Sequence, residues 1–373
     1  MLTRLYVDNY KCLVNFDLRL GREHLLMGRN GTGKTTVFEV LSSLRRLKAG
    51  RATIDEVFLP STLTRWQKRT RQIIELEIAL DGEGYRYRLE IEHDADRNRS
   101  LVDSESLHQG DTLLLSLQPR KQFAKFLAEG GQLVDLYSAG DRPCMAYFQD
   151  APPWHEKIRR FSNWLERLYI VRCDPRRMSG RSESEEAVPA EDLSNFASWY
   201  RHLAQERLNE VVHLREELRN TLDGFDSLIL KSGGERVRML RALWKRGATE
   251  PGSTNTDEYA FEELSEGQRA IIGLYSLLYF LSDSGATLCL DEPDNFVALS
   301  EIQPFLLALR EQERIQALLI SHHPEVINLL APGSGRWFER FSGGPVRVSP
   351  FEAPPEAAVT AAELVARGWE HGK

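Results

Sequence analysis

Cysteine is scarce in this sequence of 373 residues, and its spacing excludes the usual cysteine-based sites. The cysteines are Cys12, Cys144, Cys173 and Cys289, so no two of them form a C-x-x-C pair. This spacing excludes a zinc ribbon and argues against the disulfide framework of a small secreted domain. We therefore expect reduced thiols and a cytoplasmic protein.

Long hydrophobic runs are also missing. The longest mostly apolar stretch, residues 270–281, is well short of the ~20 residues that cross a bilayer. The first residues, MLTRLYVDNYKCL, lack the apolar core that a secretory signal needs. We expect no membrane segment.

Positive charge is not in excess either. Lys and Arg number 48 against 55 Asp and Glu, which gives a formal net charge of −7. A globally basic nucleic-acid-binding protein is thereby excluded, so any contact with DNA must be confined to a local patch. Three basic clusters could form one, although a solvated face is the simpler interpretation of each: Arg45, Arg46, Lys48 and Arg51; Arg65, Lys68, Arg69 and Arg71; and Arg172, Arg176, Arg177 and Arg181.

The remaining composition is that of a folded protein. Hydrophobic residues make up 42% of the chain, and its length is compatible with two or three domains. The spacing of apolar residues predicts α/β segments at both ends of the chain. These are strands at 2–9, 14–20, 25–27, 286–290 and 317–321, helices at 35–48, 267–281, 300–312 and 361–367, and a hairpin around 342–344.

The middle of the chain has a different pattern. Alternation in residues 72–80 and 85–91, separated by a DGEG turn, predicts a β-hairpin. With a further strand at 113–117, it indicates a small antiparallel lobe. Beyond the lobe we predict a helix at 155–168, a strand at 168–171, an unpatterned loop at 181–192, one long helix over 193–222, and strands at 228–230 and 237–240.

The strongest chemical signal is GRNGTGKT at residues 28–35, which fits G-x-x-x-x-G-K-[ST] between a predicted strand and a predicted helix. Glycines let backbone N–H groups turn toward phosphate oxygens, and the start of the helix adds its positive dipole end. Lys34 would neutralise phosphate charge, and the Thr35 hydroxyl would bind Mg²⁺. The alternative is an ordinary glycine turn between strand and helix.

A second signal is TLCLDE at residues 287–292, an apolar strand that ends in two carboxylates. Buried carboxylates are costly without a partner, and in a P-loop fold this strand end faces the nucleotide. Asp291 would then hold Mg²⁺, and Glu292 would polarise the attacking water. An acidic turn after an unrelated strand is the alternative.

Two shorter motifs follow the same order along the chain. LSEGQ at residues 264–268 precedes a helix, where Ser265 either forms a second anion site or simply caps the helix together with Gln268. ISHHP at residues 320–324 ends a buried strand, where a histidine could hydrogen-bond a γ-phosphate. Paired histidines could also bind a metal, but no third ligand lies at a sensible spacing, and a solvated loop remains an alternative.

In this order the four motifs resemble the ABC-type ATPase head. The lead-in LYVDNYKCLVNF with GRNGTGKTT is similar to the SMC/RecF/OLD branch rather than to transporter subunits. The resemblance covers residues 1–50 and 260–325 well, and the middle only in layout. It implies an α/β P-loop NTPase with an ABC-type head, an antiparallel β lobe and a helical insertion.

The implied organisation is discontinuous. Residues 1–50 and 258–373 would form the ATPase core, residues 51–150 a β-rich lobe, and residues 151–257 a helical insertion that leads into the LSEGQ signature.

The resemblance also implies roles for individual residues, because in that family two heads sandwich two ATP molecules. Thr35 and Asp291 would hold Mg²⁺, Glu292 would be catalytic, and His322 rather than His323 would be the switch histidine. The glutamine that usually contacts Mg²⁺ is not identified. The ATP phosphates would be bound by Asn30, Gly31, Thr32, Gly33, Lys34, Thr35 and Thr36 of one head and by Ser265, Gly267 and Gln268 of the other.

The chain resembles a bare head. Too few residues separate Lys34 from Ser265 for the long coiled coil of SMC proteins, no cysteine-based zinc hook is present, and no Asp-x-Asp cluster of an OLD-type nuclease follows Pro324. Such heads are similar to the ATPase halves of two-gene bacterial defence modules, in which a nuclease or toxin is a separate protein. The resemblance thus implies a Mg²⁺-dependent ATPase that forms a homodimer or larger assembly and switches an effector, DNA or both, in anti-phage defence or DNA repair.

Two other functions remain open. A transporter nucleotide-binding subunit would share the phosphate loop, although the β-rich insertion and the NYKCL lead-in argue against it. A P-loop kinase acting on a small molecule would also share it, but would leave LSEGQ and SHHP without a role.

Overall fold

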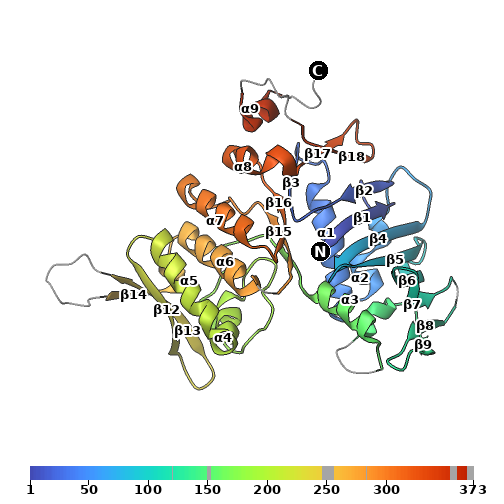
Figure 1. The fold of residues 1–373 in the computed structure, drawn as a ribbon, viewed down its shortest axis with the longest axis horizontal. Coiled ribbons are helices and arrows are strands. Elements are labelled where there is room, and N and C mark those ends of the chain that lie inside the picture. The colour runs from blue at the N-terminus through green and yellow to red at the C-terminus, as the bar shows by residue number, and fades with distance from the viewer. Residues whose placement is uncertain (120, 149–152, 246–255, 283, 353–358, 368–373) are drawn as a thin grey trace.

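Two large sheets organise the computed structural model (Figure 1). One has six strands and is mostly parallel, and the other has eight antiparallel strands. The structure describes residues 1–119, 121–148, 153–245, 256–282, 284–352 and 359–367. Within these residues, the element types predicted for the two ends of the chain are confirmed.

The parallel sheet forms the core of the α/β part. Its strand order is β10 (Leu168–Val171), β15 (Thr287–Asp291), β16 (Gln316–Ile320), β3 (Glu23–Gly28), β17 (Gly335–Arg340) and β18 (Val346–Pro350), of which only β18 is antiparallel to its neighbour. All residues of β15 and β16 are buried. Burial on both faces explains why these two strands are continuously apolar in the sequence.

The two faces of this sheet pack against different layers. Leu318 and Ile320 of β16 join the core that contains α1 (Lys34–Lys48) and the antiparallel sheet. Ala317 and Leu319, which point the other way, join the core with α6 (Glu266–Leu281), α7 (Leu299–Glu311), α8 (Pro324–Ser334) and α9 (Ala361–Ala366). The phosphate loop and the carboxylates therefore lie at the edge of a sheet that is held from both sides.

The antiparallel sheet begins earlier in the chain than predicted. Leu5 of β1 lies opposite Leu76 of β4, so segment 1–50 contributes two strands to a sheet that we expected within residues 51–150. The prediction missed this pairing because alternation identifies a strand but not its partner. The strand order is β2 (Phe16–Arg19), β1 (Leu2–Asp8), β4 (Arg71–Leu80), β5 (Glu83–Asp94), β6 (Arg99–Gln109), β7 (Thr112–Leu117), β8 (Phe123–Leu127) and β9 (Leu133–Tyr137).

Strand β6 was not predicted because its buried face includes polar side chains. Glu105 is 1% exposed and accepts hydrogen bonds from the Tyr87 hydroxyl (3.0 Å), the Met145 N–H (3.0 Å) and the Cys144 N–H. These bonds satisfy a carboxylate that would otherwise be costly to bury. A strand built in this way lacks the apolar alternation that predicts one.

The single long helix predicted over residues 193–222 is wrong, because the chain breaks it at Arg207. The backbone there has φ −134° and ψ 53°, and it separates α4 (Phe196–Glu206) from α5 (Leu208–Thr221). A straight helix would run away from the core at about 1.5 Å per residue, whereas α5 packs on α6, where Tyr279 donates a hydrogen bond to Glu217 (3.1 Å). The predicted α3 (Glu156–Glu166) is confirmed, and a third sheet contains β11 (Arg181–Ser182), β12 (Phe225–Ser232), β13 (Arg238–Lys245) and β14 (Thr256–Ala260).

Candidate functional site

The turn between β3 and α1 has a backbone that requires glycine. Gly28 has φ +143° and Gly33 has φ +93°, values that L side chains rarely adopt. A Cβ atom at Gly28 would lie 2.3 Å from the Phe338 carbonyl oxygen, and one at Gly33 would lie 2.8 Å from the Cys12 sulfur. The loop therefore wraps tightly against its neighbours immediately before the start of α1.

Lys34 is held at this helix start in a largely buried position. Its Nζ donates to the carbonyl oxygens of Gly28 (2.7 Å) and Arg29 (3.1 Å), and the residue is 6% exposed. Burial lowers the pKa of Lys34, whereas the charges of Asp291 and Glu292 raise it. A buried ammonium group beside a helix start is suited to hold phosphate oxygens.

The two carboxylates at the end of β15 have different environments. Burial raises the pKa of Asp291, whereas the charge of Arg172 and the nearby Thr35 hydroxyl lower it. A threonine hydroxyl beside one carboxylate fits the few protein ligands that Mg²⁺ takes when substrate phosphates supply others. The described residues contain no cluster of three or more His, Cys, Asp or Glu that could hold a metal by themselves.

Glu292 is set apart by its backbone and by its contacts. It has φ +52°, which is uncommon for a residue with a side chain, and its N–H donates to the Ile320 carbonyl (2.8 Å). Its Oε2 accepts from Asn295 Nδ2 (2.9 Å) and lies 3.5 Å from a guanidinium nitrogen of Arg172. Asn295 thus orients the carboxylate, as suits a group that positions a water molecule, while the Arg172 ion pair occupies one of its oxygens.

The two adjacent histidines have separate positions. His323 caps α8, because its Nδ1 accepts the Glu325 N–H at 3.2 Å. His322 instead lines the same cavity as Lys34 and Glu292, and burial and the charge of Lys34 lower its pKa. At neutral pH this imidazole is therefore predominantly uncharged.

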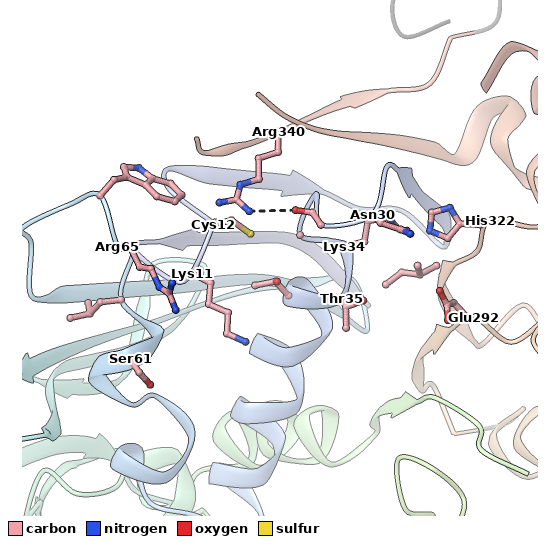
Figure 2. A pocket seen from close by; sticks show the side chains of 16 residues that line it. Lys11, Cys12, Asn30, Lys34, Thr35, Ser61, Arg65, Glu292, His322 and Arg340 are labelled. Carbon is pink, nitrogen blue, oxygen red and sulfur yellow. Dashed lines mark hydrogen bonds between the residues drawn. The ribbon is translucent and has the colours of Figure 1, made fainter. Parts of the chain in front are cut away.

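These groups meet in one cavity of about 520 Å³ (Figure 2). The sequence-predicted residues that line it are Asn30, Gly31, Gly33, Lys34, Thr35, Thr36, Glu292 and His322. Thr32 does not line it, since its hydroxyl donates to the Arg29 carbonyl (2.8 Å) and the residue is buried. Asp291 lies behind the lining and reaches it through Thr35.

The LSEGQ residues lie outside this cavity. Ser265 caps α6, with its Oγ accepting the Gln268 N–H (3.1 Å) and its own N–H donating to Gln268 Oε1 (2.9 Å). The capping box that the sequence allows is therefore present, on an exposed helix start. Gly267 packs closely there, because a Cβ atom on it would lie 2.9 Å from the Phe296 carbonyl oxygen. None of Ser265, Gly267 and Gln268 lines the cavity.

The sequence analysis missed about half of the cavity lining. Lys11 and Cys12 belong to the NYKCL lead-in and Ile320 to ISHHP, but none of the three was assigned to the site. The missed residues come from the β1–β2 turn, from the segment before β4, from β16 and from the end of β17: Lys11, Cys12, Ser61, Leu63, Arg65, Trp66, Ile320 and Arg340. Four of them belong to residues 59–70, which we call the strap. The strap begins after α2 (Ile54–Val57) and includes a short 3₁₀ turn (Pro60–Thr62).

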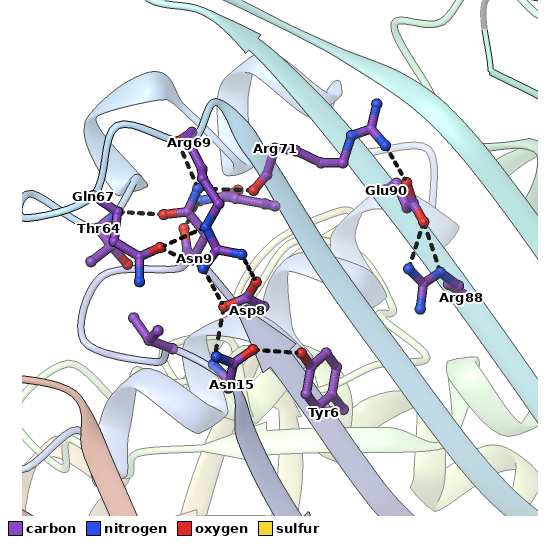
Figure 3. A network of polar contacts seen from close by, with 12 residues as sticks. Tyr6, Asp8, Asn9, Asn15, Thr64, Gln67, Arg69, Arg71, Arg88 and Glu90 are labelled. Carbon is purple, nitrogen blue, oxygen red and sulfur yellow. Dashed lines mark hydrogen bonds and ion pairs between the residues drawn. The ribbon is translucent and has the colours of Figure 1, made fainter.

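A polar network anchors the strap to the end of β1 (Figure 3). Asn9 is fully buried at φ +63°; its Nδ2 donates to the carbonyls of Arg69 and Arg71 (both 2.8 Å), and its Oδ1 accepts the Thr64 N–H (3.3 Å). Asp8 accepts two hydrogen bonds from the Arg69 guanidinium, at 2.7 and 3.2 Å. This network therefore fixes the strap where it lines the cavity.

The three basic clusters are largely committed to contacts within the chain. Arg65 lines the cavity and Arg69 pairs with Asp8. The remaining contacts are Arg71 with Glu90, Glu92 and Asp103, Arg172 with Glu292, Arg176 with Glu266, Arg177 with Asp192, Arg181 with Glu183, Lys48 with Glu166, and Arg45 over the Tyr169 ring. Ion pairs therefore engage every residue of the third cluster, together with Arg69 and Arg71 of the second, which reduces the charge that these two clusters offer to a DNA backbone.

Across the described parts of the chain, no helix is both long and apolar enough to cross a membrane.

Two family models match the sequence in separate parts. The ABC transporter model matches residues 13–184. A second model, described as "AAA domain, putative AbiEii toxin, Type IV TA system", matches residues 248–328. The first match contains the phosphate loop, and the second contains LSEGQ, both carboxylates and both histidines. No curated protein matches the sequence significantly.

Solved structures are similar in fold at low sequence identity. A Smc head bound to the C-winged helix domain of ScpA aligns with a TM-score of 0.56 and 12% identity over 94% of this chain and 98% of that one. A Smc head domain with an extended coiled coil, bound to the C-terminal domain of ScpA derived from Pyrococcus furiosus, aligns with a TM-score of 0.54 and 11% identity over 94% and 96%. The resemblance drawn from the motifs is therefore confirmed at the level of the fold.

Proposed function

Because the chain has the α/β fold of an ABC-like ATPase head of the SMC kind, we propose that it binds ATP with Mg²⁺ in this cavity and hydrolyses it. We further propose that ATP joins two copies of the chain in a sandwich dimer. The dimer would act as a nucleotide-driven switch on an effector protein, on DNA, or on both.

The observation that carries the proposal is the meeting of distant segments in one cavity. Lys34 and Thr35 come from α1, Glu292 from the end of β15, and His322 from the end of β16, and all of them line it. These are the groups that phosphoryl transfer to water needs: a cation for phosphate oxygens, a metal ligand, a carboxylate and a γ-phosphate contact.

Each group has a distinct task in this proposal. The loop peptides and Lys34 hold the phosphates, while Thr35 and Asp291 would hold Mg²⁺, which neutralises charge on the β- and γ-phosphates when bound. Glu292, held by Asn295, polarises the attacking water. His322, uncharged at neutral pH, donates a hydrogen bond to the γ-phosphate and loses that contact after hydrolysis.

The position of the signature supports the sandwich. Ser265 and Gly267 lie at an exposed helix start outside the cavity, so they have no contact with a nucleotide bound in their own chain. A second copy could present its phosphates to this helix start, where N–H groups and the helix dipole favour an anion. Closure would then depend on the γ-phosphate, and hydrolysis would release it.

The Glu292→Gln variant tests hydrolysis and assembly together. We expect it to bind Mg²⁺ and ATP, to turn over at least about 100-fold more slowly than the wild type, and to accumulate as an ATP-bound dimer or larger assembly in light-scattering measurements. Adding Ser265→Arg should return it to monomers that still bind ATP.

The matched control is Glu325→Gln, a glutamate that follows the neighbouring strand but does not line the cavity. It should behave as the wild type does. Wild-type turnover by Glu292→Gln would refute the catalytic role, and monomeric Glu292→Gln saturated with ATP would refute the sandwich.

For the partner, a protein effector such as a separate nuclease or toxin is better supported than DNA. The two Smc heads that share this fold are each bound to a ScpA domain, and the basic clusters of this chain are mostly ion-paired. A role in anti-phage defence or DNA repair follows from the family resemblance. Co-purification of the tagged Glu292→Gln variant with its genetic neighbour, with and without ATP, tests this part.

A transporter subunit is the second candidate, because the ABC transporter model matches residues 13–184. It predicts that the chain binds an integral membrane partner with or without nucleotide. Recovery of the ATP-bound assembly in the absence of any membrane protein would count against it.

A further inference from the structure

The hairpin of β17 and β18 reaches the cavity through one side chain. Arg340, at the end of β17, donates from Nε to the Gly344 carbonyl (2.8 Å) and from Nη2 to the Gly343 carbonyl (2.8 Å). Its Nη1 lies 3.5 Å from the Gly31 carbonyl of the phosphate loop (Figure 2). Carbonyl groups on two elements thus hold the guanidinium plane in one orientation.

Trp66 of the strap lies against this guanidinium. The Arg340 Cζ is 5.5 Å from the centre of the indole ring, within the range of a cation–π contact. The indole lines the cavity and is 44% exposed, although tryptophan is one of the more buried residue types on average. The strap that carries it is anchored by the buried residues Asn9 and Asp8, which hold it in position.

The cavity gives the direction in which a nucleotide would lie. Figure 2 shows Glu292 and His322 on one side of the phosphate loop, and Lys11 and Arg65 on the other. A nucleotide whose γ-phosphate faces Glu292 and His322 therefore extends its base toward the strap, where the aromatic ring of the cavity lining is that of Trp66.

We propose that Trp66, backed by Arg340, is the stacking platform for the nucleobase of the bound nucleoside triphosphate. This inference rests on the proposed ATP site and adds the β17–β18 hairpin to it. Arg340 acts as a positioning residue, because it holds the indole from behind and links it to the phosphate loop.

The platform selects an aromatic ring rather than a pattern of donors and acceptors. An indole face offers no hydrogen bond, and the Arg340 donors described above point to backbone carbonyls. Base–aromatic stacking tolerates any base, because every base has a π-face. Trp66 therefore contributes to the affinity for ATP and for GTP by similar factors.

The test compares ligands with and without a base. Mg²⁺-ATP and Mg²⁺-tripolyphosphate are titrated into the full-length protein and into Trp66→Ala, with binding measured by calorimetry. We expect Trp66→Ala to lower the affinity for ATP about tenfold, which is the effect of losing one base–aromatic stack. The affinity for tripolyphosphate should change less than about twofold. Trp66→Phe should retain ATP affinity within about threefold of the wild type.

Arg340 and a strap control complete the set. Arg340→Gln should lower the affinity for ATP about threefold and the affinity for tripolyphosphate less. Arg340→Lys, which keeps the positive charge, should lower the affinity for ATP less than Arg340→Gln does. Leu59→Ala, on the same strap but outside the cavity lining, should leave both ligands unchanged.

The outcomes separate this inference from the proposed function. If Trp66→Ala weakens both ligands equally, or neither, the platform is refuted while the ATP site stands. If the wild-type protein binds neither ATP nor tripolyphosphate, both the proposed ATP site and the platform are refuted.

Discussion

The ion pair between Asp8 and Arg69 gives a prediction that links stability to nucleotide affinity. The Asp8 side chain is 3% exposed and accepts both guanidinium hydrogen bonds, whereas the Arg69 side chain is 51% exposed. Removing one partner of a fully buried pair costs about 3–5 kcal/mol, and an exposed pair contributes about 0–1 kcal/mol. For this half-exposed pair we expect Arg69→Ala to lower the free energy of unfolding by about 2 kcal/mol.

The same substitution should raise the KM for ATP without changing kcat. Arg69 lies at the end of the strap that carries Arg65 and Trp66 into the cavity, far along the chain from Glu292. Asn9 still holds the strap in the variant, so we expect a partial effect, of about three- to tenfold in KM. Urea unfolding followed by circular dichroism gives the stability, and steady-state ATP hydrolysis gives KM and kcat.

Arg88→Ala is the matched control, since Arg88 pairs with Glu75 and Glu90 on the open face of the same sheet but does not contact the strap. It should cost less than about 1 kcal/mol and leave KM unchanged. The reasoning is refuted if Arg69→Ala behaves as Arg88→Ala does, or if it lowers kcat while KM stays constant. A double-mutant cycle of Asp8→Asn with Arg69→Gln measures the coupling directly.

Three further predictions concern separate residues. Arg172→Ala should raise basal ATP turnover up to about fivefold, as measured by phosphate release, because it frees Glu292 from an exposed ion pair worth at most about 1 kcal/mol. Burial lowers the pKa of His93 to about 4 from its ordinary 6.5, so the unfolded chain binds a proton on this histidine before the folded chain does as the pH falls. The free energy of unfolding should therefore drop by up to about 1.4 kcal/mol per pH unit between pH 6.5 and pH 4. Urea titrations of His93→Gln should show no such pH-dependent drop. Gly33→Ala should weaken ATP binding at least about tenfold in calorimetry, because the new Cβ meets the Cys12 sulfur at φ +93°.

The part of the site that lies in contiguous motifs could be predicted from the sequence. Strand–loop–helix order around Lys34, and an apolar strand ending at Asp291 and Glu292, are local patterns whose spatial meaning follows from a parallel sheet. The structure also gives the two adjacent histidines different positions, which the residue pattern alone does not distinguish. One of the two caps α8 and the other lines the cavity.

The remaining part depends on contacts between distant segments. Trp66 and Arg340 lie far apart in the chain, with strands of all three sheets between them in sequence, so no local pattern pairs them. For the basic cluster around Arg69 the sequence left open a local DNA patch or a solvated face, because sequence shows charges but not their partners. The structure shows that Arg69 pairs with Asp8. The break at Arg207 has no glycine or proline to mark it, and only the packing of α5 on α6 accounts for it.

The strands that pair with β3 determine when the phosphate loop can fold. The strand that leads into the phosphate loop lies between β16 and β17, and both of these strands follow it far along the chain. Until those two strands exist, the loop has no sheet to hold its shape, and such long-range pairing makes folding slow. ATP would bind only the completed site, and would therefore stabilise only those chains in which β16 and β17 have already paired with β3. The cavity would thereby act as a checkpoint, since an incomplete chain could neither bind nucleotide nor enter an ATP-linked assembly.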